Sequence, residues 1–216
     1  MIARLFTRSL ATTLLVAASS AASLSAQEDP LLRRGSASRA RGQENAQLFV
    51  YEFADFQCPH CARFAIEVFP RIDSAFVRTG KVHWIFVNLP LHTHPNAWLA
   101  HEAAVCAGAI ADRFWAMHDR IFATQLEWGT SSDPGPVLAR LARDAGVPAD
   151  RYADCTSGDR VAALLLRDLT FAINSRVNGT PAFNINNEHS VVGLKSFEEW
   201  KEMLERILKT QAARKN

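Results

Sequence analysis

Cys58, Pro59, His60 and Cys61 are the residues of this chain whose types and spacing are best suited to chemistry. Two cysteines separated by two residues at the start of a helix can face each other, so they can change between a dithiol and a disulfide without moving the backbone. An apolar, strand-like segment precedes them and a helical pattern follows them. The sequence therefore predicts a redox-active pair.

The predicted position of Cys58 at a helix N-terminus favours its thiolate form. Unpaired amide N–H groups and the positive end of the helix dipole lie there. Pro59 suits the first helical turn, where its missing N–H costs nothing, and His60 can add positive charge or a hydrogen-bond donor. A stabilised thiolate makes the disulfide a stronger oxidant. The alternatives are a structural bridge or half of a zinc site.

Two strand-like segments and one helix must position this tetrad. Residues 48–56 are apolar and aromatic enough for a buried strand, although Glu52 lies within them. Apolar residues then recur at three and four positions up to about Thr79, which predicts a helix kinked by Pro70. Residues 81–88 form a second short apolar run. The order predicts a β-α-β unit with parallel strands.

The chain then changes character twice. Residues 92–174 carry helical spacing throughout and predict a helical subdomain. Residues 178–193 combine turn residues with two short apolar runs, which is typical of a tight turn leading into a β-hairpin. Ser196 and Glu199 form a capping box that opens a final helix. The helical block therefore interrupts an α/β domain.

The N-terminal residues are expected to lie outside this domain. Arg4 and Arg8 precede a short apolar stretch that ends in small residues, so residues 1–26 are interpreted as a cleaved secretory signal, with an uncleaved anchor as the alternative. Residues 27–46 are polar and lack periodicity, and we expect a flexible arm without a fold. Without the signal, 22 basic residues balance 22 acidic ones, so no electrostatic footprint for nucleic acid is expected.

Three segments resemble the thioredoxin superfamily, and within it the bacterial periplasmic thiol:disulfide oxidoreductases of the DsbA type. They are Phe53–Cys61 (Phe-Ala-Asp-Phe-Gln-Cys-Pro-His-Cys), Gly108–Phe122 and Gly179–Ile185 (Gly-Thr-Pro-Ala-Phe-Asn-Ile). The resemblance implies a thioredoxin-like α/β fold with an inserted helical subdomain. The thioredoxin-like domain is expected at residues 47–91 and 175–212, and the helical insertion at residues 92–174.

The resemblance also implies roles for single residues. Cys58 is expected to be the nucleophile that forms mixed disulfides, and Cys61 the more buried resolving partner. Pro181 is expected to follow a cis peptide bond beside Cys58, where the Thr180 backbone pairs with a substrate strand. Glu52 matches the buried acid of the family and is expected to relay protons to or from Cys61, with a raised pKa. A purely local hydrogen-bonding role is the alternative for Glu52.

The function implied by this resemblance is donation of the Cys58–Cys61 disulfide to reduced or unfolded secreted proteins in the periplasm, by a monomer. A quinone-linked membrane protein of the DsbB type is the implied reoxidising partner, and no cofactor is expected besides the redox-active disulfide. Thr180 replaces the Val usual in oxidising members and also occurs in isomerase-type relatives. A disulfide isomerase or reductase therefore stays open, as does a non-catalytic peptide-binding module.

Cys106 and Cys155 are the two remaining cysteines, and both fall in the predicted insertion. Because exported proteins keep disulfides, we expect a structural disulfide between them; two inert thiols are the alternative. Closing a loop of about 50 residues would stabilise the fold by roughly 4 kcal/mol. His92, His94 and His101 lack the helical pairing typical of metal ligands, and no metal site is expected.

Overall fold

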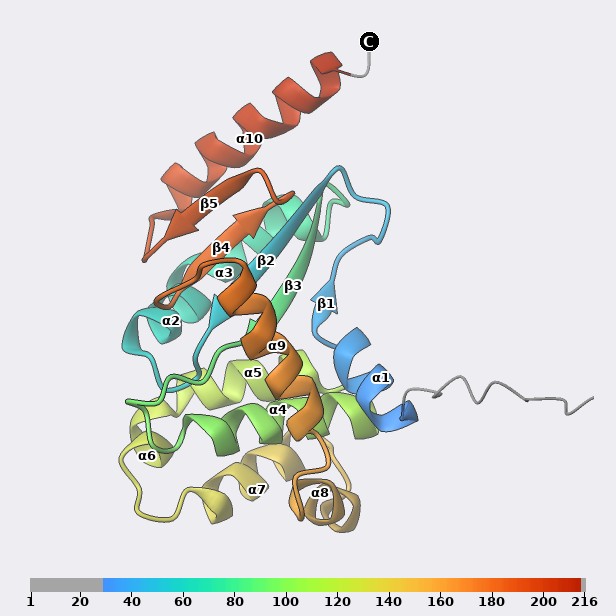
Figure 1. Cartoon of the computed structure of the whole chain (residues 1–216), viewed down its shortest axis with the longest axis vertical. Coiled ribbons are helices and arrows are strands. Elements are labelled where there is room, and N and C mark those ends of the chain that lie inside the picture. Colours follow the sequence, from blue (N-terminus) through green and yellow to red (C-terminus); the bar gives the residue numbers. More distant parts are fainter. Residues whose placement is uncertain (1–28, 215–216) are drawn as a thin grey trace, which may run out of the picture.

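The computed structural model describes residues 29–214 (Figure 1). The predicted signal at residues 1–26 lies outside the described residues. Within residues 29–214, no helix has both the length and the apolar character needed to cross a membrane.

A five-stranded mixed sheet forms the centre of the α/β part. Its order is β1-β3-β2-β4-β5, and only the pair β2–β3 is parallel. The strands are β1 (Ala40–Arg41), β2 (Leu48–Ala54), β3 (Val82–Asn88), β4 (Ala182–Ile185) and β5 (His189–Val192). The central strands β2 and β3 are apolar on both faces, as expected for strands covered on both sides.

One face of the sheet is covered by the helical segment that carries the cysteines and by the C-terminal helix. The segment runs through α2 (Pro59–Arg63), the π-helical turns η1 (Phe64–Val68) and η2 (Asp73–Val77), and α3 (Phe69–Ile72), which lies between those turns. Pro70 falls in the first turn of α3, where its missing N–H is tolerated, and π turns flank it on either side. The C-terminal helix, α10 (Phe197–Arg214), opens with the predicted capping box: Ser196 and Glu199 exchange hydrogen bonds at 2.8–3.2 Å.

The opposite face of the sheet packs against α9 (Ala162–Asn174). Phe171 of that helix contacts Tyr51 and Phe53 of β2, with ring centroids 5.2 and 5.3 Å apart. In Figure 1, α9 descends from the sheet to the helical part of the molecule. This helix therefore belongs both to the insertion and to the wall of the sheet.

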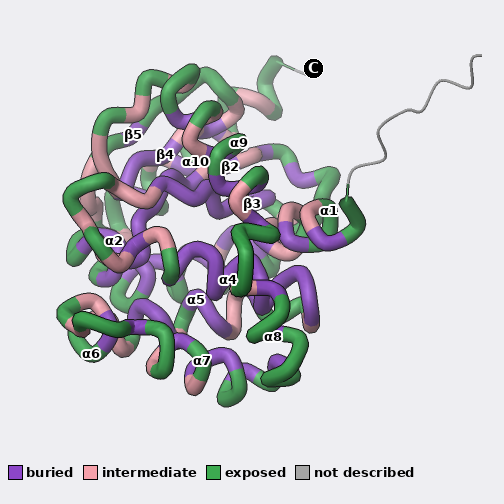
Figure 2. The backbone as a smooth tube through the Cα atoms, turned by 60° about the horizontal axis from the view of Figure 1, so that its bottom comes forward, coloured by how far each residue is buried: buried purple, intermediate pink, exposed green. Residues whose placement is uncertain are grey.

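The insertion between β3 and β4 is built around one mostly buried helix. Twelve of the fifteen residues of α4 (Ala97–Ala111) are buried, and most of them are small. Figure 2 shows this helix as a buried tube among its neighbours. The other helices are α5 (Phe114–Ala123), α6 (Gln125–Gly129), α7 (Gly135–Asp144) and α8 (Ala149–Thr156), with α9 last.

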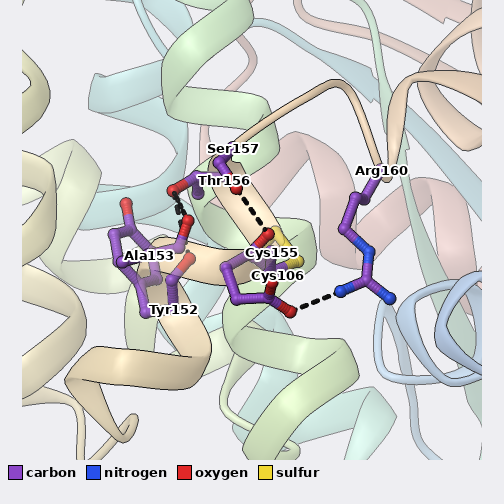
Figure 3. The surroundings of a disulfide bond; sticks show 8 residues. Cys106, Tyr152, Ala153, Cys155, Thr156, Ser157 and Arg160 are labelled. Carbon is purple, nitrogen blue, oxygen red and sulfur yellow. Dashed lines mark hydrogen bonds and ion pairs between the residues drawn. A yellow bond between two sulfur atoms is a disulfide. The ribbon is translucent and has the colours of Figure 1, made fainter.

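A disulfide between Cys106 of α4 and Cys155 of α8 joins two helices of the insertion (Figure 3). Their Cα atoms are 5.9 Å apart and both side chains are buried. This is the pairing predicted from the sequence. The exposed Ser157 and Arg160 follow in the connection to α9.

The prediction of a flexible arm at residues 27–46 is wrong for most of that range. Asp29 caps helix α1 (Pro30–Ala37), because its carboxylate accepts a hydrogen bond from the Leu31 N–H at 2.8 Å. The helix packs closely on α4, because Gly35 leaves room for Val105; a Cβ on Gly35 would lie 2.9 Å from it. β1 then extends the sheet. The polar composition hid these contacts because they depend on small side chains.

Candidate active site

The tetrad lies where β2 passes into α2. β2 ends at Ala54 and α2 begins at Pro59, so Cys58 is the residue that caps the helix, with an extended backbone (φ −75°, ψ 123°). The Cys58 N–H donates to the Asp55 carbonyl at 3.0 Å, which closes a tight turn. The helix N-terminus therefore presents its free amide groups to the Cys58 side chain.

Cys58 carries an unusually acidic thiol. Its surroundings lower the pKa from 9.0 to about 5, mainly through a hydrogen bond from the Cys61 side chain. The Thr180 side chain and the amides of Cys61 and His60 lower the pKa further, whereas burial opposes them. The residue is only 5% exposed, but Pro59 and His60 beside it are exposed. At neutral pH, Cys58 is therefore a thiolate when reduced.

Cys61 has the opposite character. It is fully buried, and its thiol is free, as is that of Cys58. Burial raises its pKa well above the ordinary value, and the hydrogen bond to Cys58 acts in the same direction. The two cysteines of the tetrad are thus an accessible anion and a buried neutral thiol.

The Thr180–Pro181 segment lies beside the tetrad, although 122 positions separate Thr180 from Cys58 in the sequence. The Thr180–Pro181 peptide bond is cis, as the resemblance implies, and the Thr180 carbonyl oxygen lies 3.5 Å from the Cys58 sulfur. The hydroxyl of Thr180 is buried and interacts with the thiols of both cysteines. The structure therefore brings together Cys58, Cys61 and Thr180.

Glu52 is buried in the centre of the sheet, at the position of β2 that pairs with Phe86. Burial raises its pKa from 4.5 to about 8, although the Trp84 indole N–H, which donates to one carboxyl oxygen at 2.7 Å, opposes this. The other oxygen has no hydrogen-bond partner among residues 29–214. In the described part of the chain, no hydrogen bond joins Glu52 directly to either cysteine, so its relay role stays a prediction.

Asp55 is a buried residue of the site that sequence reasoning missed. Its carboxylate accepts hydrogen bonds from the amides of Gln57 and Leu91, each at 2.7 Å, and lies 2.8 Å from the ring of His94. It therefore ties the loop before Cys58 to the loop after β3. His94, for which the sequence indicated no partner in a metal site, contacts an acidic side chain here.

A second network of buried hydrogen bonds connects the same loop to α4, β3 and α9. The Phe56 N–H donates to His101 of α4 at 3.4 Å, and His101 is 2.8 Å from the side-chain oxygen of Asn88. Asn88 donates to Asp168 of α9, which pairs with Arg39. Burial lowers the pKa of His101 to about 3, so the ring is neutral and accepts from Phe56.

A mostly apolar hollow of about 610 Å³ opens beside the tetrad. Pro59, Ala62 and Ile66 line one side of it, and Leu126 of α6 lies on the other. Ile66 and Leu126 are 54% and 82% exposed, which is high for such side chains. The reactive sulfur is therefore next to exposed apolar surface. Within the described residues, no group of three or more His, Cys, Asp or Glu side chains could hold a metal ion.

A family model described as thioredoxin matches residues 35–206 of the chain. The chain belongs to the thioredoxin family. Among structures of similar proteins, DsbA1 of Wolbachia pipientis superposes with a TM-score of 0.73 at 21% sequence identity, over 82% of this chain and 94% of that one. The predicted thioredoxin-like fold with an inserted helical subdomain and the resemblance to DsbA-type proteins are both confirmed.

Two curated relatives of the chain differ in how much of their own length it matches. The disulfide bond formation protein D of Bacillus subtilis is 27% identical over 173 residues, covering 78% of this chain and 76% of that protein. The Na⁺/H⁺ antiporter NhaA 3 of Salinispora tropica is 34% identical over 147 residues, or 68% of this chain. The chain spans only 21% of that antiporter's length.

Proposed function

We propose that the chain is a thiol:disulfide oxidoreductase that donates a Cys58–Cys61 disulfide to other polypeptides. The observation that carries this proposal is the asymmetry of the dithiol: the pKa of Cys58 is lowered to about 5, whereas burial raises that of Cys61. A thiolate this stable is a good leaving group and favours the reduced protein, so the disulfide form is the electron acceptor. The similarity to a disulfide bond formation protein supports the same reaction.

The reaction follows from the two environments. A substrate thiolate attacks the Cys58 sulfur of the disulfide, a substrate–Cys58 bond forms, and the bond to Cys61 breaks. Cys61 leaves with the electron pair and takes up a proton, for which Glu52 is the proposed source. A second substrate thiolate then attacks the substrate sulfur and Cys58 leaves as a thiolate. The substrate loses two electrons and the enzyme gains them.

The substrates we propose are reduced or unfolded exported proteins. A Thr180 carbonyl 3.5 Å from the Cys58 sulfur offers an acceptor for a substrate amide, and the hollow lined by Ile66 and Leu126 offers apolar surface. Unfolded chains expose both kinds of group. Regeneration requires an oxidant, for which we propose a quinone-linked membrane protein of the DsbB type. Export to the periplasm is proposed from the pattern of residues 1–26.

The test uses the purified protein with Cys58 and Cys61 oxidised, mixed with a reduced peptide that contains two cysteines. We expect stoichiometric peptide oxidation by wild type and none by Cys58→Ala. Cys61→Ala is mixed instead with the peptide in its disulfide form: the Cys58 thiolate attacks that disulfide, one peptide sulfur leaves as a thiolate, and the mixed disulfide persists because Cys61 is absent, so it is visible by mass spectrometry. Equal behaviour of wild type and Cys58→Ala would refute the proposal. Equilibration with glutathione decides the direction: a potential near that of thioredoxin, about −270 mV, would instead assign a reductase.

A further inference from the structure

The loop before the tetrad takes part of its hydrogen bonding from the helical insertion. Two carbonyl oxygens of this loop, those of Phe56 and Cys58, accept hydrogen bonds from one nitrogen, the side-chain Nε2 of Gln125. The distances are 2.7 and 3.0 Å. Gln125 is the first residue of α6, and 67 positions separate it from Cys58. In Figure 1, α6 lies on the same side of the molecule as α2.

We propose that Gln125 is a positioning residue of the dithiol: its side-chain amide fixes the backbone of Cys58 so that the sulfur stays opposite the helix amides that favour its thiolate. The inference rests on the proposed function, because it concerns how readily Cys58 leaves as an anion. Gln125 touches backbone oxygens and no reacting atom, so it acts through Cys58.

The first argument is geometric. The Cys58 carbonyl already accepts the first hydrogen bond of the helix, from the Ala62 N–H at 3.1 Å, and Gln125 supplies a second donor. Two donors on one oxygen restrict rotation of the peptide plane. That plane sets the direction of the Cys58 side chain relative to the amides of His60 and Cys61. A fixed carbonyl therefore keeps the sulfur within reach of those donors.

The second argument is electrostatic. The carbonyl oxygen of Cys58 carries a partial negative charge close to the thiolate of the same residue, and the two repel. A hydrogen-bond donor on that oxygen reduces the repulsion and favours the anion. Because the bond is part-buried, water replaces the lost donor poorly. The loss of the Gln125 amide should therefore weaken the thiolate.

Further amide groups hold α6 in place for this contact. Gln57 donates to the Gly129 carbonyl at 2.9 Å and accepts from the Asn96 N–H at 2.8 Å. The Asn96 side chain donates to the Ser131 and Trp128 carbonyls at 2.8 and 3.1 Å. Both ends of α6 are thus fixed to the loop that carries Cys58. Gln125 loses little additional freedom in making its bonds.

Other titratable groups surround Cys58 and have to be held constant in a test. Cys61 and His60 are on α2, the helix that Cys58 caps, and the Asp55 carbonyl accepts the Cys58 N–H. On α6, Glu127 is paired with Arg140 of α7 at 2.6 Å. A substitution of Gln125 leaves all of these unchanged.

The test measures the Cys58 pKa from the ultraviolet absorbance of its thiolate in Gln125→Met, which keeps the length of the side chain and removes the donor. We expect the pKa to rise by about half a unit to one unit, in line with the loss of one hydrogen bond. The rate of peptide oxidation should fall with it. Gln47→Met is the matched control, because it makes the same change at an exposed glutamine that does not line the hollow, and its Cys58 pKa should equal that of wild type.

Gln125→Glu supplies a second variant, since it keeps the size, lacks the N–H donors and brings a negative charge. It should raise the Cys58 pKa more than Gln125→Met does. Unchanged pKa values in the folded variants, checked by circular dichroism, overturn the assignment of Gln125 and leave the proposed function standing. Absence of peptide oxidation by wild type would overturn the proposed function, while the pKa comparison would still decide the role of Gln125.

Discussion

Burial, more than charge pairing, sets the chemistry of the single residues at this site. Within the described residues Glu52 forms no ion pair, and its carboxyl is protonated at neutral pH because the surrounding sheet excludes water. Cys61 is neutral for the same reason. Cys58 is the exception, since it lies at a helix N-terminus where amides and a neighbouring thiol stabilise its anion. Opposite protonation states therefore coexist within one helical turn.

Glu52→Gln is predicted to change how stability depends on pH. The carboxyl has a pKa of 4.5 in the unfolded chain and about 8 in the fold. Below 4.5 both states hold the proton. Between 4.5 and 8 the unfolded chain has released it and the fold has not, so the stability supplied by Glu52 falls as pH rises and is fully lost above 8. The free energy of unfolding of Glu52→Gln, relative to wild type, should rise by about 1 kcal/mol per pH unit in that window.

Urea unfolding at several pH values measures this difference. Glu199→Gln, an exposed acid in the capping box, serves as the control for a general loss of charge. A difference between Glu52→Gln and wild type that stays constant from pH 5 to pH 8 would contradict the raised pKa.

Residue-level prediction from the sequence succeeds where the signal is local. Only two residues separate Cys58 from Cys61, and an acid inside an apolar strand, such as Glu52, is visible directly in the sequence. Asp55 and Gln125 give no such signal. Their partners, Leu91 and Cys58, lie 36 and 67 positions away, so the hydrogen bonds exist only after the chain has folded.

Elements that look unstructured in the sequence are held here by buried polar contacts. Arg39, between α1 and β1, is 5% exposed and pairs with Asp168 of α9. Asp168 also accepts from the backbone and side chain of Asn88 at the end of β3, at 3.0 and 2.7 Å. The N-terminal segment, the sheet and the insertion therefore meet at one carboxylate. An isolated arginine in a polar segment does not indicate in the sequence that it will be buried and paired with a distant carboxylate.

Asp168→Asn is predicted to destabilise the protein by about 3–5 kcal/mol, because it leaves the buried Arg39 without a counter-charge. Asp144→Asn removes a carboxylate whose partner, Arg140, is half-exposed, and should change stability by less than about 1 kcal/mol. Chemical denaturation of both variants measures the difference. Equal free energies of unfolding of the two variants would show that the buried Arg39–Asp168 pair stabilises the fold no more than a partly exposed pair does.

The described residues pack into three hydrophobic clusters, and the largest joins the insertion to the helix that carries the tetrad. Helical spacing in residues 92–174 predicted the insertion, and the boundaries of α4 and α9 agree with that range. How the insertion docks could not be predicted, because it depends on hydrogen bonds from amide groups to carbonyl oxygens among Gln57, Asn96 and α6 that have no sequence pattern. The Cys106–Cys155 pairing was predictable because only those two cysteines lie in the block.

Removal of this disulfide is predicted to cost stability and leave the reaction intact. Closure of the loop between residues 49 positions apart is worth about 4 kcal/mol in the chain-entropy model. The double variant Cys106→Ala/Cys155→Ala should unfold at correspondingly lower denaturant, and its Cys58 pKa should match that of wild type. A changed pKa would mean that the insertion transmits strain to the tetrad.

The long sequence separation between Cys58 and Thr180, 122 positions, has a consequence for biosynthesis. The dithiol is complete once Cys61 has emerged, whereas the Thr180–Pro181 segment that faces it is made only after the entire insertion. Long-range contacts of this kind form late, and domains are made from the N-terminus onwards. A chain interrupted within the insertion therefore carries both cysteines of the tetrad without their substrate-facing wall. Both cysteines are therefore made before the segments that lower the pKa of Cys58 and face its substrate.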